Sequence, residues 1–342
     1  MSQPREEAPA PRGPRQSVWR DAGAALSLVF GSPLAFFILT AVAFMAAYFF
    51  QLGPSLQNLA FLGSRPVGLW HIFLPIQPAL WLVTSLLVWG ELRKPDPLWP
   101  DTRREQMAVV LCTSVTLAMI GLPFVAQFIS WPEMPSLATL NTPSMSAFRT
   151  RLLILSLIGI AVAVLQALSV FCVHVQLLRL SSAPPARGTV CEAGDLDEDV
   201  RRYLKLRARL RLFLSLVAVN VGTSVLSLGI LRNLLNAAHP ARPELFPAAP
   251  VVGYSVYLTG LLANGYLPVR KTLVDVGEAL AERLVRQSLG AQAPWKARFE
   301  EQQAARTYLG LRESAFQELQ QGISVLAPLL GGLSSLLLSP GG

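Results

Sequence analysis

Long apolar stretches separated by short polar or charged segments dominate the hydrophobic pattern of this chain. Six of them lack Asp, Glu, Lys and Arg over about 20 residues or more, the length that an α-helix needs to cross the hydrocarbon core of a bilayer. They cover residues 22–50, 66–90, 107–130, 152–178, 212–231 and 245–269. The pattern therefore predicts an all-α polytopic integral membrane protein with about six transmembrane helices.

The distribution of Lys and Arg between the connecting segments predicts the orientation of these spans. Segments 1–20, 91–106, 179–211 and 270–342 carry four, four, eight and eight Lys or Arg residues, whereas the other three loops together carry five. Because cytoplasmic loops hold the positive excess, we expect the N- and C-termini to be cytoplasmic. The loop 179–211 is expected on the same side.

Composition narrows the class of protein. The chain has 342 residues, of which 52% are hydrophobic and 15% charged, whereas a soluble domain carries about 25% charged residues. This excludes a water-soluble enzyme, a collagen, a disulfide-knotted toxin and a wholly disordered chain. The net charge of +8 lies mainly at span ends, where it meets anionic lipid headgroups. The expected partner is therefore the lipid bilayer and not nucleic acid. The excess of Arg over Lys indicates a bacterial protein of the inner (plasma) membrane.

The domain organisation follows from the same pattern. Residues 1–20, rich in Pro and charge, predict a disordered cytoplasmic tail, and residues 21–269 form the six-span bundle. Residues 270–342 predict a helical cytoplasmic tail whose apolar positions repeat every three or four residues, as in a heptad seam. The seam comprises Phe316, Leu319, Ile323, Leu326, Leu330, Leu333 and Leu337.

Three interpretations of this seam remain open. It can dock against the chain's own cytoplasmic helices, pair with another copy of the chain, or lie in the membrane interface. Because residues 322–342 carry no charge, the last interpretation extends to a seventh span. In each interpretation the seam is covered, because its apolar face is too large to stay in water.

Candidate chemistry within the spans is limited to uncharged polar side chains. The six spans contain no Asp, Glu, Lys or Arg, which disfavours a proton-coupled transporter. Metal-binding spacings and nucleophile motifs are also absent from the sequence, so we predict no catalytic residue, cofactor or metal ligand. The polar candidates for helix packing or for lining a pore are Gln127, Gln166, Asn220 and Asn264.

These observations favour a non-enzymatic membrane anchor, sensor or effector that oligomerises or docks a cytoplasmic protein partner through its cytoplasmic helices. One alternative is a channel or uncoupled transporter with an uncharged polar pore. The second alternative is an intramembrane enzyme acting on a lipid. The residues do not identify the ligand, partner or stoichiometry.

Overall fold

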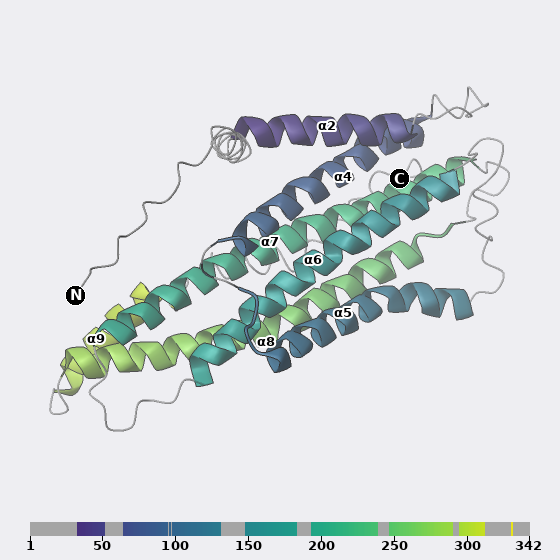
Figure 1. The fold of residues 1–342 in the computed structure, drawn as a ribbon. Helices are drawn as coiled ribbons and strands as arrows, with labels where there is room; N and C mark the ends of the chain where they lie inside the picture. The colour runs from purple at the N-terminus through teal and green to yellow at the C-terminus, as the bar shows by residue number, and fades with distance from the viewer. Residues whose placement is uncertain are drawn as a thin grey trace, which may run out of the picture.

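The computed structural model describes residues 33–51, 64–94, 96, 98–130, 148–182, 193–238, 246–289, 294–311 and 330. Within these residues every regular element is an α-helix, and the helices form an elongated bundle (Figure 1). The elements are α2 (Pro33–Gln51), α4 (Arg65–Leu92), α5 (Arg103–Ser130), α6 (Phe148–Ser182), α7 (Ala193–Ala238), α8 (Ala249–Ser288) and α9 (Trp295–Tyr308).

Helices α6 and α7 lie at the centre of the bundle. Helix α6 packs against α4, α5, α7 and α8, while α7 packs against α4, α6 and α8. Helix α2 packs mainly on α4, and α9 packs on α8. The bundle is therefore built around an α6–α7 pair that the other helices flank.

Four helices of the described part are long and apolar enough to cross a membrane. Their spanning ranges are Arg65–Leu92, Arg103–Leu122, Thr150–Ser181 and Leu196–Ala238. They contain or overlap the second to fifth spans expected from the sequence. For the first expected span, the described apolar helix is the shorter Ala35–Phe50. Helix α8, which includes residues 249–269 of the sixth, is long enough but lacks the apolar character of the four.

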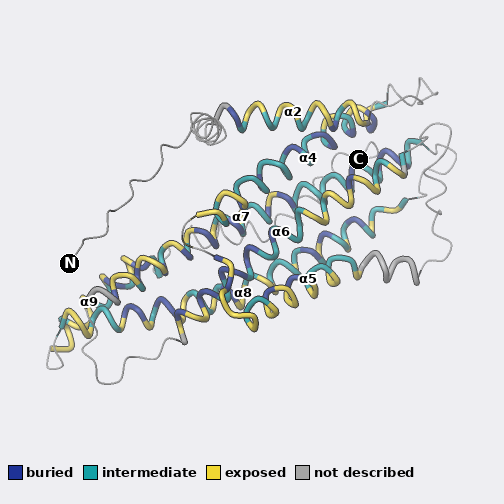
Figure 2. Tube along the Cα trace, viewed as in Figure 1, coloured by how far each residue is buried: buried dark blue, intermediate teal, exposed yellow. Residues whose placement is uncertain are grey.

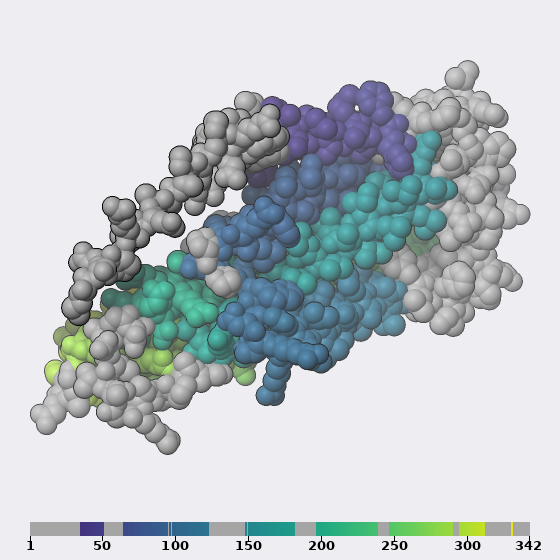
Figure 3. All heavy atoms as spheres, viewed as in Figure 1, coloured from purple at the N-terminus to yellow at the C-terminus, as the bar shows by residue number. Residues whose placement is uncertain are grey.

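Large apolar side chains cover the outward faces of the bundle, as lipid contact requires. Figure 2 shows exposed residues recurring along α2 and along the described part of α5, and Figure 3 shows the two helices at opposite edges of one view of the molecule, with α4 and α6 between them. Phe37 on α2 is 75% exposed, and Met107 and Leu111 on α5 are each 65% exposed. In water such faces would be costly, so the architecture is that of a multi-pass membrane protein.

Two helices are much longer than a membrane span. Helix α7 has 46 residues and α8 has 40; at 1.5 Å per residue they are about 69 and 60 Å long. The hydrocarbon core accounts for only about 30 Å. Helix α7 also runs without a break from Ala193 through the fifth expected span. Both helices therefore extend well beyond any membrane that they cross.

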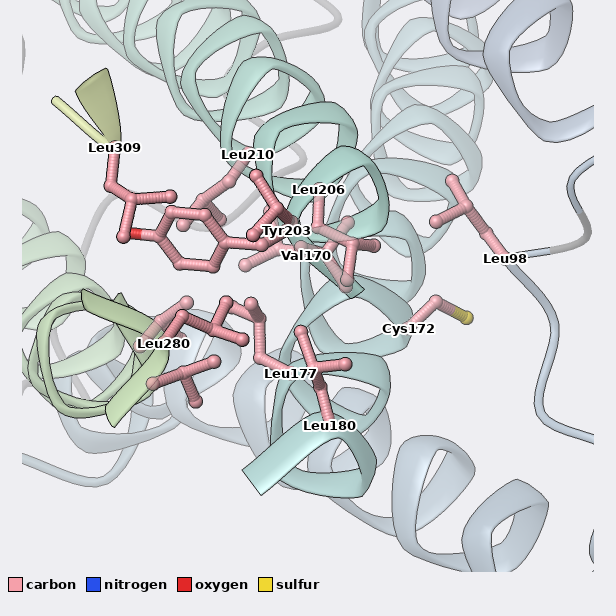
Figure 4. Packing of buried hydrophobic residues seen from close by; sticks show 14 of the residues in the cluster. Leu98, Val170, Cys172, Leu177, Leu180, Tyr203, Leu206, Leu210, Leu280 and Leu309 are labelled. Carbon is pink, nitrogen blue, oxygen red and sulfur yellow. The ribbon is translucent and has the colours of Figure 1, made fainter. Parts of the chain in front are cut away.

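The extended helix ends pack together, with adjoining residues of the expected spans, in a buried group that we call the Tyr203 cluster. Tyr203, Phe213 and Leu177 are fully buried in it. The cluster joins α6, α7, α8 and α9 with the segment between α4 and α5, and Figure 4 shows part of it. The residues labelled there are Leu98, Val170, Cys172, Leu177, Leu180, Tyr203, Leu206, Leu210, Leu280 and Leu309.

A second buried group, the Trp70 cluster, lies at the opposite end of the same helices. It consists of Val67, Trp70, Leu74, Leu155, Ile230, Leu234 and Leu235. These residues come from the start of α4, the start of α6 and the end of α7. The end of α4, the start of α5, the end of α6 and the start of α7 thus lie at the Tyr203 end with α9, whereas the start of α4, the start of α6 and the end of α7 lie at the Trp70 end. This alternation is that of an up-and-down bundle.

Helix α9 is fixed to the cluster by charged groups around its last turn. Arg207 donates hydrogen bonds to the carbonyl oxygens of Leu309, at 2.9 Å, and of Gly310. Arg306 forms an ion pair with Glu278 of α8 at 2.8 Å. The guanidinium of Arg207 therefore donates to carbonyl oxygens that have no acceptor role within α9, at the C-terminus of the helix, where a positive charge is favourable.

Gly310 and Gly277 let these groups approach one another. Gly310 has φ of +67°, and a Cβ there would overlap the guanidinium of Arg207. A Cβ at Gly277 would lie 2.6 Å from Tyr203 Oη and from Leu311 Cδ2. Both positions therefore require glycine, for conformation at the first and for space at both.

We predict that Gly310→Ala lowers the free energy of unfolding of the α9 attachment by about 1–3 kcal/mol, because it adds left-handed backbone strain and displaces Arg207. Thermal unfolding in detergent and limited proteolysis between α8 and α9 measure the effect. The control is Gly68→Ala, at an exposed helical site with open space around it. It should leave stability unchanged or raise it, since Ala favours a helix over Gly by about 0.5–1 kcal/mol. Equal behaviour of the two variants would contradict this account.

Candidate functional site

Uncharged polar side chains from three helices meet in the interior of the bundle. Asn220 of α7 donates from Nδ2 to Thr84 Oγ1 of α4 at 2.8 Å. Gln166 of α6 directs its Nε2 at the same oxygen at 3.5 Å. All three side chains are at most 4% exposed. The hydroxyl of Thr84 in turn donates to the carbonyl oxygen of Trp81 at 3.2 Å, so one threonine links α4, α6 and α7.

A second group of polar side chains lies next to this one on α4 and α7. Ser227 Oγ donates to Gln77 Oε1 at 2.6 Å, and Gln77 Nε2 donates to Ser224 Oγ. Ser224 donates to the carbonyl oxygen of Asn220 at 2.7 Å, which connects the two groups. We call the six side chains the polar layer: Gln77, Thr84, Gln166, Asn220, Ser224 and Ser227.

Helical spacing explains why these residues meet. Gln77 and Thr84 are seven residues apart on α4, and Asn220, Ser224 and Ser227 follow at intervals of four and three on α7. Each set therefore occupies one helix face. Hydrogen bonds of this kind between membrane helices contribute about 0.6 kcal/mol on average and up to about 1.7. The polar layer thus fixes the register of α4, α6 and α7 more than it adds bulk stability.

The residues expected to be functional do not all reach this layer. The structure brings Gln166 and Asn220 together, whereas Asn264 lies on an exposed face of α8. Gln127 lies on α5 in a stretch whose side chains are outside the described part. Asn220 Oδ1 is buried and has no hydrogen-bond partner among the residues that the structure describes. The sequence analysis missed Thr84 and Ser227. The signal that could have identified them is spacing: Thr84 follows Gln77 by seven residues, and Ser227 follows Asn220 by seven.

The apolar seam lies almost wholly outside the described residues. Of its seven members the structure describes Leu330, which is helical and 50% exposed. Its proposed roles in docking and oligomerisation therefore stay predictions.

A largely buried ion pair joins α4 and α7 between the polar layer and the Tyr203 end of the bundle. Arg209 Nε lies 3.2 Å from Glu91 Oε2, and the two side chains are 8% and 17% exposed. Arg209 Nη1 also donates to the carbonyl oxygen of Asp96 at 3.3 Å. Lys94 lies 2.5 Å from the other oxygen of Glu91. The buried guanidinium is therefore neutralised and hydrogen-bonded, as burial requires.

Further contacts hold the segment between α4 and α5 against α6 and α7. Lys205 pairs with Asp96 at 2.7 Å and Arg179 pairs with Asp101 at 2.8 Å. The hydrogen bond and the charge of Lys205 lower the pKa of Asp96 below its ordinary value. The ion pair of Asp96 with Lys205 thus contributes to stability above the ordinary pKa of a free Asp, about 4. This contribution is lost as the pH falls through the lowered pKa of Asp96. These exposed pairs position the loop without contributing much to stability.

Gln176 of α6 forms a bridge between two of these segments. Its Nε2 donates to the carbonyl oxygen of Leu98 at 3.4 Å, and its Oε1 accepts from Arg202 at 2.7 Å. Together with the pairs of Arg179 with Asp101 and of Lys205 with Asp96, this bridge joins residues 179–211 to the segment 91–101. The paired residues are 78 or more positions apart in sequence.

The arrangement contains hydrogen-bond donors and acceptors but little that could perform covalent chemistry. Within the described residues, no group of three His, Cys, Asp or Glu side chains could hold a metal ion. Comparisons of the chain with protein-family models, with curated proteins and with solved structures give no match. Inference about function therefore rests on the geometry of the chain itself.

We predict that Thr84→Val lowers the free energy of unfolding by about 1–2 kcal/mol, because it leaves two buried amide donors without their shared acceptor. Unfolding in mixed detergent micelles measures this loss. Thr116→Val is the control, since its hydroxyl bonds only to the carbonyl of Cys112 in its own helix. Combining Thr84→Val with Asn220→Leu should cost less than the sum of the two; strict additivity would mean that the two side chains are not coupled.

Removing the buried cation should also be costly. We expect Arg209→Met to lower the free energy of unfolding by about 1.5–3 kcal/mol, the range for hydrogen bonds to charged groups. The loss should not be larger than this, because Lys94 still neutralises Glu91 in the variant. Lys205→Met removes an exposed cation of similar length and should have a much smaller effect. If the two variants unfold at the same denaturant concentration, burial does not distinguish the two ion pairs.

Proposed function

We propose that the protein is a non-enzymatic membrane anchor of the bacterial inner membrane that carries a helical cytoplasmic docking unit. In this proposal six spans cross the membrane, namely α2, α4, α5, α6 and the membrane parts of α7 and α8. The N-terminal tail and the Tyr203 end of the bundle are cytoplasmic. The docking unit consists of the extended ends of α7 and α8 together with α9.

The observation that carries this proposal is the length of α7 and α8 relative to a bilayer. Their extensions pack around Tyr203 and bind α9, which leaves a rigid helical body attached directly to the membrane bundle. A chain that served only to line a pore would have little use for such a body. A docking or sensing protein requires one, because a partner in the cytoplasm needs a surface held at a fixed distance from the lipid.

Charge placement supports the orientation. The segments with the most Lys and Arg, 91–106, 179–211 and 270–311, all contribute to the Tyr203 end. Arg179, Lys205 and Arg306 form their ion pairs there. Since the cytoplasmic side holds the positive excess, this end belongs in the cytoplasm.

The polar layer supports packing over conduction. The amide groups of Gln77, Gln166 and Asn220 bond across helices and are almost completely buried. A pore lining would instead present such groups to water along one continuous face. Asn264, the other amide considered for a pore, faces away from this layer.

Helix α9 supplies the surface that we assign to a protein partner. Trp295 and Phe299, four residues apart on one face of α9, are 80% and 54% exposed, and Tyr308 is 63% exposed on the opposite side; the helix lies beyond the expected spans. Aromatic side chains are enriched in protein interfaces, where they supply large contact areas at a low cost in entropy.

The topology is tested by a cytoplasm-dependent reporter inserted at two places in the full chain. We expect activity when the reporter is inserted after Gly290, between α8 and α9, and silence when it is inserted after Ser136. The physical reason is that the first site lies at the basic Tyr203 end and the second at the opposite end. The reverse result would refute the proposed orientation, and activity at both sites would refute the alternation of the spans.

The docking role is tested with a photo-crosslinking amino acid in living cells. Placed at Trp295, it should give a discrete protein adduct that Phe299→Ala weakens several-fold. Placed at Val110, which is exposed on the apolar face of α5, it should react with lipid. The adduct mass distinguishes a second copy from a different protein. Absence of any protein adduct at both Trp295 and Tyr308, combined with protein-dependent ion leakage from liposomes, would favour the channel instead.

A further inference from the structure

One face of α8 differs from the other exposed faces of the bundle. Gly253, Val256, Gly260, Asn264 and Leu267 follow one another at intervals of three or four residues, and all five are exposed. A Cβ added at Gly253 or Gly260 would meet nothing within 4 Å. We call these five residues the α8 face; it lies within the sixth expected span.

The composition of the α8 face suits contact with a helix better than contact with lipid. Where α5 and α6 are exposed, they present large side chains such as Leu111 and Leu157, which are 65% and 66% exposed. The α8 face presents two glycines and an amide. Small residues allow two helix backbones to approach closely, and an amide can bond across the contact. In hydrocarbon the same amide would find no partner.

Helix α9 identifies what can reach this face. Glu278 follows Gly260 by eighteen residues, which is five full turns of 3.6 residues, so both lie on one side of α8. Arg306 of α9 pairs with Glu278 at 2.8 Å. Beyond the expected span, Arg306 of α9 therefore reaches the continuation of the α8 face, while Leu311 lies next to Gly277, about 100° further round α8.

The direction of α9 leads the chain back toward the membrane. Helix α8 ends at Ser288 and α9 begins at Trp295, whereas the last turn of α9 reaches Glu278 and the following Leu311 lies next to Gly277. The two helices are thus antiparallel. Gly277 lies eight residues beyond the end of the expected span at Val269, or about 12 Å along the helix.

The residues that follow Leu311 have the length and composition of a span. Residues 312–321 contain Arg312, Glu313 and Glu318, and residues 322–342 contain no charged residue. Since a helix would end before Pro340, the stretch 322–338 measures about 26 Å at 1.5 Å per residue, close to a hydrocarbon core of about 30 Å and within the roughly 17–25 residues that spans use. Gly331, Gly332 and Ser335 lie in the second half of this stretch, where small residues favour close helix contact.

We propose that residues 322–342 cross the membrane as a further span packed on the α8 face. The proposal rests on the orientation proposed above and changes one part of the sequence expectation: residue 342 lies on the side opposite α9. The Lys and Arg count does not oppose this, because all eight basic residues of the tail lie between Arg270 and Arg312.

The crossing is tested by labelling single cysteines in the full chain, with Cys112, Cys172 and Cys191 replaced by Ser. A membrane-impermeant maleimide should label Gly342→Cys in intact spheroplasts and Gly290→Cys only after permeabilisation. If both cysteines label on the same side, the further span is refuted while the orientation of the bundle is still reported by Gly290→Cys. If Gly290→Cys labels in intact spheroplasts and Gly342→Cys does not, the orientation is inverted but the crossing stands.

The contact itself is tested with a photo-crosslinking amino acid at Val256. It should form an adduct within the chain, and mass spectrometry should place the second site within residues 322–342. The matched control at Leu111, on the lipid-facing side of α5, should not. An adduct between two copies would show that a second chain covers the α8 face, and lipid adducts alone would show that nothing does; either result overturns the proposal.

Discussion

A bilayer interior offers no hydrogen-bond partner, so each polar group that enters it must be satisfied by the protein. Helix formation satisfies the backbone, and the side chains that remain must find each other. In this chain Thr84 takes that role, since its one oxygen accepts from Asn220 and Gln166 and its proton goes to a carbonyl of its own helix. The relative depth of α4, α6 and α7 depends on this layer, because sliding any helix by one turn would leave buried amides unpaired.

The same constraint explains how the membrane bundle and the Tyr203 cluster form one body. Helix α7 carries the amide of Asn220 at one level and the guanidinium of Arg209, eleven residues earlier, at another. Both groups are bonded to α4 or its following loop. Apolar packing around Tyr203 then continues the same helix contacts beyond the lipid. The cluster is therefore an extension of the bundle and not a domain joined to it by a linker.

The helical class and the positions of most helices could be predicted from hydropathy, because a run of about twenty uncharged, mostly apolar residues is characteristic of a membrane helix. The continuation of α7 through the charged residues 193–211 could also be predicted, because the acidic residues at 195–199 mark a helix start and the apolar positions Val200, Tyr203 and Leu206 fall on one face. Pairings between distant residues, such as Arg209 with Glu91, were not predicted, because each charge looks like an ordinary signal of orientation. Thr84 was missed because threonines are common in apolar runs, and its seven-residue spacing from Gln77 becomes informative only once Gln77 is known to face α7.

Arg209 has a consequence for how the protein responds to its membrane. Its charged group is buried against Glu91 only three residues before the apolar stretch 212–231 begins. A slide of α7 toward the lipid would draw this bound guanidinium into hydrocarbon, at a cost of several kcal/mol, while a slide outward would expose the apolar turns behind it. The pair thus sets the immersion depth of the longest helix. A thicker or thinner bilayer must therefore be accommodated by tilting the whole assembly, which would swing the Tyr203 end of the bundle sideways through a distance magnified by the length of α7.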